Sequence, residues 1–178
     1  MPLKSIRAWL GVDAPEKQTV AEKQKFAPLR ETLEALEHLE PDRARHLAAF
    51  AYLLGRVAHA DQDVSPEETS AMEALIREQV HLPEDQAMVV VQLAKTSNLL
   101  FGGTANFLVA REFSALATHE EKLALMRCLF AVSAADDVIS LAEEGELHKI
   151  AKELGIEHSH LVALRVAYQQ HLPGRLRT

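Results

Sequence analysis

Two short acidic stretches decide how this chain is expected to fold: residues 60–68 read ADQDVSPEE and residues 135–143 read ADDVISLAE. A constant offset of 75 positions superimposes them, and it pairs identical residues along both stretches: Ala60 with Ala135, Asp61 with Asp136, Ser65 with Ser140, and Glu68 with Glu143. An internal repeat of this size indicates one supersecondary unit used twice. Each copy reads as an apolar helix, an acidic turn and a second helix.

Each acidic turn carries the signature of a helix start. Ser65 is a good N-cap, Pro66 suits the first helical position, and Glu68 completes a capping box. Residues 140–143 repeat the box without the proline. The aspartate that precedes each box ends the preceding helix, and its side chain can accept hydrogen bonds from backbone N–H groups of the turn. In this structural interpretation the acidic residues only shape two helix–turn–helix corners.

The turns nevertheless carry more carboxylates than capping requires. Unpaired carboxylates that lie close together repel one another unless a cation or a basic partner neutralises them. Hard oxygen ligands of this kind favour calcium, magnesium or manganese. If the repeats pack face to face, the clusters form either one site or two. The residues expected to hold the metal are Asp61, Asp63, Glu68, Asp136, Asp137 and Glu143.

The spacing does not match an EF-hand. Asp61, Asp63 and Ser65 occupy the places of its loop positions 1, 3 and 5. Position 6 is Pro66 rather than glycine, and position 12 is Met72 rather than glutamate. A calmodulin-type calcium loop is therefore excluded.

The repeated pattern of an apolar helix, Ala-Asp, a short turn, Ser and Glu resembles the TerB family of tellurite-resistance proteins. The resemblance covers roughly residues 40–170, with the unit present at residues 60–68 and 135–143. It implies a compact all-helical domain with an acidic, metal-binding face and a link to stress or tellurite-resistance systems. The family usually has glycine after the aspartate, where this chain has Gln62 and Asp137.

Composition sets the domain organisation. The chain has 178 residues, 48% of them apolar, which predicts an N-terminal arm over residues 1–15 and a single helical domain over residues 16–178. A net charge of −7 argues against a nucleic-acid binder with a broad basic surface. The single cysteine, Cys128, excludes an internal disulfide and is expected to be a buried, inert thiol. No signal peptide or membrane span is recognised, so a cytoplasmic protein is expected.

The first twelve residues form a weakly amphipathic segment if they are helical. Apolar side chains alternate with two basic ones: Leu3, Ile6, Trp9 and Leu10 with Lys4 and Arg7. Such a segment could rest on a membrane surface or on a partner. Docking of Trp9 and Leu10 onto the domain's own surface is the favoured interpretation.

The predicted fold is all-α, a compact bundle of about seven to eight helices. Its core is a pair of pseudo-repeated helix–turn–helix units at about residues 42–80 and 119–154. In the first apolar helix, residues recur at intervals of three and four and predict one buried face: Leu47, Phe50, Ala51, Leu54 and Val57. Residues 16–39 are expected to form a further charged helix.

Function is predicted from the acidic turns, because no catalytic constellation is recognised; the histidines, for example, form no H-E-x-x-H. The leading hypothesis is a non-enzymatic module that binds a divalent cation or a basic partner through both turns. The alternative is a metal-free protein–protein interaction scaffold in which the carboxylates only cap helices. A third hypothesis, a metal-dependent hydrolase, would need a substrate pocket. A protein partner is expected, and the oligomeric state is left open.

Overall fold

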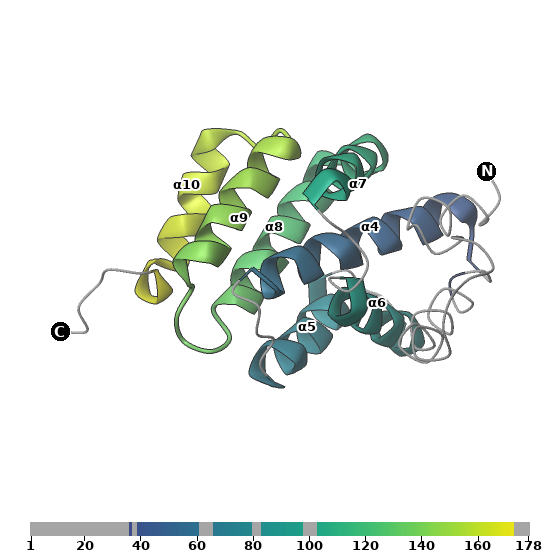
Figure 1. The fold of residues 1–178 in the computed structure, drawn as a ribbon, viewed down its shortest axis with the longest axis horizontal. Helices are drawn as coiled ribbons and strands as arrows, with labels where there is room; N and C mark the ends of the chain where they lie inside the picture. Colours follow the sequence, from purple (N-terminus) through teal and green to yellow (C-terminus); the bar gives the residue numbers. More distant parts are fainter. Residues whose placement is uncertain (1–35, 37–38, 61–65, 80–82, 98–102, 173–178) are drawn as a thin grey trace.

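The structure, a computed structural model, describes residues 36, 39–60, 66–79, 83–97 and 103–172. Within these residues the chain forms seven α-helices and one short 3-10 turn, with no strand among them (Figure 1). The predicted all-α fold is thereby confirmed. The N-terminal arm and nearly all of the helix expected over residues 16–39 lie outside the described residues.

Both repeats contain the two helices that the sequence predicts. In chain order the elements are α4 (Pro41–Ala58), α5 (Pro66–Gln79), α6 (Glu84–Ser97), α7 (Gly103–Leu116), α8 (His119–Ser133), α9 (Leu141–Glu153), α10 (His158–Ala167) and the 3-10 turn η1 (Gln169–His171). The first repeat supplies α4 and α5, and the second supplies α8 and α9. The helices α6 and α7 connect the two repeats.

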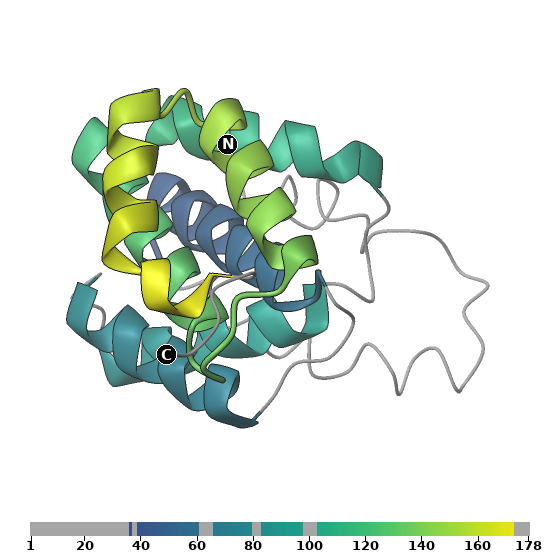
Figure 2. The ribbon, with the colours of Figure 1, turned by 90° about the vertical axis from the view of Figure 1, so that its left-hand side faces the viewer.

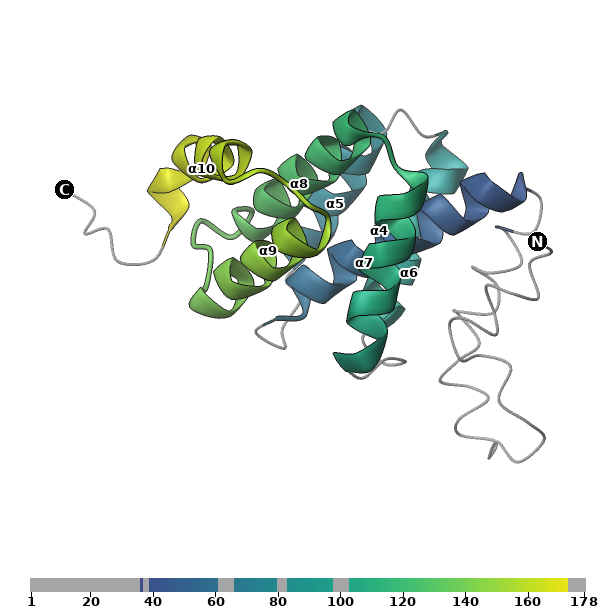
Figure 3. The ribbon, with the colours of Figure 1, turned by 90° about the horizontal axis from the view of Figure 1, so that it is seen from above.

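Helix α4 runs through the middle of the bundle. It packs against α6 and α7 on opposite sides, and also against α8 and α9 (Figures 1 and 3). The prediction of one buried face was too narrow, because Ala48, Ala49 and Leu53, which lie between the predicted positions, are also fully buried. A helix that is apolar on all sides needs neighbours on all sides, and α4 has them.

The two repeats interlock. Helix α5 of the first repeat packs on α8 of the second, and α9 of the second packs on α4 of the first. The equivalent residues Met72 and Leu147, one from each second helix, are both fully buried. Each repeat therefore packs its second helix against the first helix of the other repeat, and α9 also packs on α8 of its own repeat.

Helix α9 ends where a glycine permits it. Gly155 has φ +69°, in the left-handed region that favours glycine. Its N–H donates to the Lys152 carbonyl at 3.2 Å, and the Ile156 N–H donates to the Ala151 carbonyl at 2.9 Å. This pair of bonds is a Schellman motif, which satisfies the last carbonyls of the helix and turns the chain into α10.

The single cysteine lies in the core. Cys128 on α8 is fully buried, and burial raises the pKa of its thiol to about 12. The thiolate needed for nucleophilic chemistry is therefore strongly disfavoured, as the sequence predicts.

Candidate functional site

The six predicted metal ligands are covered only in part by the described residues. Asp61 and Asp63 lie outside them, and Glu68 lies in the first turn of α5 with its side chain not described. Asp136, Asp137 and Glu143 are all described. In the part of the chain that the structure describes, no group of three or more His, Cys, Asp or Glu residues is placed to hold a metal ion. The metal site across both turns stays a prediction.

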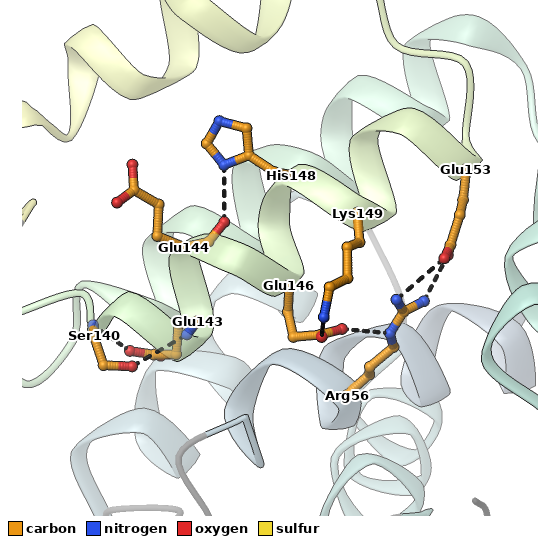
Figure 4. Close-up of polar contacts among 8 residues, drawn as sticks. All are labelled: Arg56, Ser140, Glu143, Glu144, Glu146, His148, Lys149 and Glu153. Carbon is orange, nitrogen blue, oxygen red and sulfur yellow. Dashed lines mark hydrogen bonds and ion pairs between the residues drawn. The ribbon is translucent and has the colours of Figure 1, made fainter. Parts of the chain in front are cut away.

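Glu143 acts as a helix cap. The Ser140 N–H donates to Glu143 Oε2 at 2.8 Å, and the Glu143 N–H donates to Ser140 Oγ at 3.2 Å (Figure 4). The Glu143 side chain is buried against the bundle. A second capping box, formed by Thr118 and Glu121, opens α8. The box predicted at residues 140–143 is therefore present, and capping accounts for one oxygen of Glu143. The box predicted at Ser65 and Glu68 stays a prediction, because Ser65 lies outside the described residues.

Asp136 shapes the turn in the way that the sequence suggests. It follows the last turn of α8, and its Oδ1 accepts a hydrogen bond from the Val138 N–H at 3.4 Å. The residue is exposed, so its charge faces solvent. Its carboxylate therefore combines a local backbone bond with exposed negative charge.

Asp137 takes the backbone conformation of a glycine. Its φ is +77°, and among the described residues no other non-glycine residue has a positive φ. Aspartate and asparagine tolerate this left-handed region better than other side chains do. The family resemblance places glycine after the aspartate, and Asp137 at this position adopts a positive φ of the kind that favours glycine.

The turn is held in place by the C-terminal end of the described chain. The Ile139 N–H donates to the His171 carbonyl at 2.7 Å, and His171 Nδ1 donates to the Asp137 carbonyl at 3.1 Å. Tyr168, next to η1, stacks on Phe130 of α8 with ring centroids 5.6 Å apart. The sequence analysis missed this anchor, because no local pattern relates residues so far apart in the chain.

Apolar side chains accompany the carboxylates at the turn. Val138 is 54% exposed and Leu141 is 76% exposed, whereas Ile139, which lies between them in the sequence, is fully buried. The turn lies on the same side of the bundle as α10 (Figure 2). It therefore presents two large apolar groups beside Asp136 and Asp137, a combination that suits a basic partner with an apolar residue.

A partly buried ion-pair network joins the repeats near the end of α4. Arg56 donates from Nε to Glu146 at 2.7 Å and from Nη1 to Glu153 at 2.6 Å, and Lys149 contacts Glu146 at 2.6 Å (Figure 4). Burial opposes ionisation of Glu146, but hydrogen bonds and charge from Lys149 and Arg56 lower its pKa overall. The network fixes the end of α4, which leads into the first acidic turn, against α9.

Comparison with known proteins identifies one family. A family model described as "Tellurite resistance protein TerB" matches residues 46–166, from the first turns of α4 to the end of α10. The search of curated proteins and the search of solved structures each gave no match. None of the helices in the described residues has the length and apolar character needed to cross a membrane.

Proposed function

Because this chain belongs to the TerB family of tellurite-resistance proteins, we propose that it is a non-enzymatic, cytoplasmic module of a tellurite- or stress-response system. In this role it binds a basic protein partner through its acidic turns. The observation that carries the proposal is the second turn, where exposed Val138 and Leu141 stand beside Asp136 and Asp137.

The hydrogen bonds of the second turn favour a partner over a metal ion there. Asp136 and Glu143 each direct an oxygen at a backbone N–H of their own turn. A divalent cation would have to compete with these bonds, whereas a basic side chain can share the remaining lone pairs of a carboxylate. The anchor from His171 keeps the turn in one conformation, which lowers the entropy lost on binding.

The test compares two double variants that lose the same charge. Asp136→Asn with Asp137→Asn removes the charge of the turn, and asparagine tolerates the backbone of residue 137. Glu73→Gln with Glu78→Gln removes two exposed charges from α5 and serves as the control. Binding of a peptide with one leucine among four arginines and lysines is measured by isothermal titration calorimetry.

We expect the turn variant to weaken binding by about 5- to 30-fold, because it removes two exposed charge pairs and each is worth about 0.5–1 kcal/mol. The α5 control should change affinity by less than about 2-fold. Equal weakening by both pairs would show only a response to net charge and would overturn the proposal.

Cation binding is the second candidate, and it rests on the carboxylates of both turns, Asp61 and Asp63 included. Chelator-stripped protein is titrated with calcium, magnesium and manganese while thermal unfolding is followed. An ion that binds the native state must raise its stability, and Asp61→Asn with Asp136→Asn should abolish that rise. If no ion shifts the unfolding temperature, the carboxylates act without metal, as the scaffold alternative states.

A further inference from the structure

Two histidines from distant parts of the chain lie side by side where α8 and α10 begin. His119 is the first residue of α8 and is exposed, and His160 lies in the first turn of α10 and is partly buried. The centroids of their imidazole rings are 5.3 Å apart, with an angle of 57° between the ring planes. The acidic turn follows the other end of α8, about 20 Å away along the helix, so the histidine pair is separate from it.

The separation of the two rings matches the geometry of a shared metal ion. A transition metal lies about 2.1 Å from a ligating imidazole nitrogen, and therefore about 3.2 Å from the centroid of that ring. Two imidazoles that bind one ion at the tetrahedral angle then have centroids about 5.2 Å apart, whereas a linear arrangement places them about 6.4 Å apart. The observed separation of 5.3 Å therefore suits one tetrahedral ion between the rings.

One ring nitrogen of the pair has no hydrogen-bond partner among the described residues. His160 Nδ1 is buried from solvent, and no donor or acceptor of the described chain bonds to it. A buried polar atom without a partner is uncommon in native proteins, and a bound ion is one of its explanations. Either nitrogen of an imidazole can bind a metal. An ion between the rings would give this nitrogen the bond that the described chain does not supply.

The charges next to the pair favour a cation. Helix N-termini carry partial positive charge, so a cation bound there needs carboxylates nearby. Glu120 follows the first histidine, Glu121 closes the capping box of α8, and Glu157 is the N-cap residue of α10. Lys122 is the only lysine or arginine within four positions of either histidine. Negative side chains therefore outnumber positive ones next to the pair in the sequence.

We propose that His119 and His160 bind one divalent transition-metal ion between α8 and α10. Imidazole nitrogen is a good ligand for copper, nickel and zinc, whereas calcium and magnesium prefer oxygen. Among the described residues no third His, Cys, Asp or Glu joins the pair, so water completes the coordination. Two protein ligands in place of the four in a structural zinc site supply about half of its binding free energy, which corresponds to a dissociation constant of about 1–200 µM.

Isothermal titration calorimetry of the full chain with Zn²⁺ tests the site. We expect one zinc ion to bind per chain, and His119→Gln and His160→Gln should each weaken this binding by at least about 10-fold. The exposed position of His119 makes its variant the one that disturbs folding least, and circular dichroism checks that both variants fold. Electron paramagnetic resonance of the Cu²⁺ form should show two nitrogen ligands in the wild type and one in either variant.

The control is His148→Gln with His158→Gln, which removes two other exposed histidines and leaves the pair intact. It should change the zinc affinity by less than about 2-fold. Zinc binding that survives the loss of His119 and His160, or that the control weakens as strongly, would overturn the proposal. A wild type that binds no zinc at concentrations up to about 1 mM would overturn it as well.

This inference stands apart from the proposed function. The histidine pair binds transition metals at the start of α8, whereas peptide binding depends on Asp136 and Asp137 beyond its other end. Asp136→Asn with Asp137→Asn should therefore leave zinc binding unchanged. A failure of one experiment leaves the result of the other intact.

Discussion

At the scale of single residues, the second acidic turn depends on one backbone angle. Asp137 adopts φ +77°, where a side chain with a Cβ atom is strained unless it is aspartate or asparagine. From its carboxylate alone, the sequence predicted that Asp137 is a metal ligand. The backbone shows that it is also the point at which the chain reverses between α8 and the Ser140 capping box.

A substitution series at position 137 tests this role. Asp137→Asn should leave the free energy of unfolding nearly unchanged, and Asp137→Gly should leave it unchanged or raise it by up to about 1 kcal/mol. Asp137→Val should lower it by about 1–2 kcal/mol, because a β-branched side chain is strained at this φ. Urea unfolding followed by circular dichroism measures all three.

Asp136→Val is the matched control, since residue 136 does not have a positive φ. This variant removes the carboxylate that accepts a hydrogen bond from the Val138 N–H. It should lower the free energy of unfolding by less than Asp137→Val does. If both valine variants lower the free energy of unfolding by the same amount, backbone strain does not determine which residues position 137 tolerates.

At the scale of helices, local sequence signals predicted the element ends well. Ser140 with Glu143 begins α9 as predicted, because capping depends on residues within one turn of the helix. The Arg56 network was not predicted. Arg56 lies 90 residues before Glu146, and nothing in the spacing of α4 distinguishes it from an exposed arginine.

Arg56→Met should lower the free energy of unfolding by about 2–4 kcal/mol, because it leaves partly buried Glu153 without its cation and Glu146 with the exposed Lys149 alone. Arg77→Met, which removes an exposed and longer ion pair with Glu84 at 3.8 Å, is the control and should cost less than about 0.5 kcal/mol. Chemical denaturation at neutral pH compares the two.

The pH dependence gives a second readout for this network. Arg56 and Lys149 lower the pKa of Glu146 from its ordinary value of 4.5, so near that pH the native state binds fewer protons than the unfolded state. This contribution to stability is complete above the ordinary pKa and is lost as the pH falls through the lowered one. The difference in stability between wild type and Arg56→Met should therefore hold above pH 4.5 and shrink as the pH falls below it. A difference that does not change with pH would contradict the assignment.

At the scale of the whole molecule, the interlocked repeats make the fold a single unit. Helix α5 packs on α8 and α9 packs on α4, so neither repeat contains all of its own packing partners. Repeat units that bury their apolar faces against one another lose that burial when they are separated. One repeat should not fold by itself.

A fragment of residues 118–172 tests this expectation. It keeps the caps and helices of the second repeat but lacks α4 and α5, so we expect weak helicity and broad thermal unfolding without a cooperative transition. A fragment of residues 36–172 provides the comparison and should unfold cooperatively. A sharp, two-state transition in the shorter fragment would contradict the interlocked description.

Local residue patterns by themselves determined the all-α class, the repeat and the helix ends. Helical periodicity and capping are properties of neighbouring residues, so the roles of Ser140 and Glu143 could be assigned from the chain alone. The ligand role of Asp61 and Asp63 remains a prediction, because these residues lie outside the described structure. Tertiary structure alone decided which elements meet: the central place of α4, the Arg56 network and the anchor of the turn by His171. The physical reason is that these features depend on contacts between residues far apart in the chain, and hydrophobic burial, which drives such contacts, is not directional.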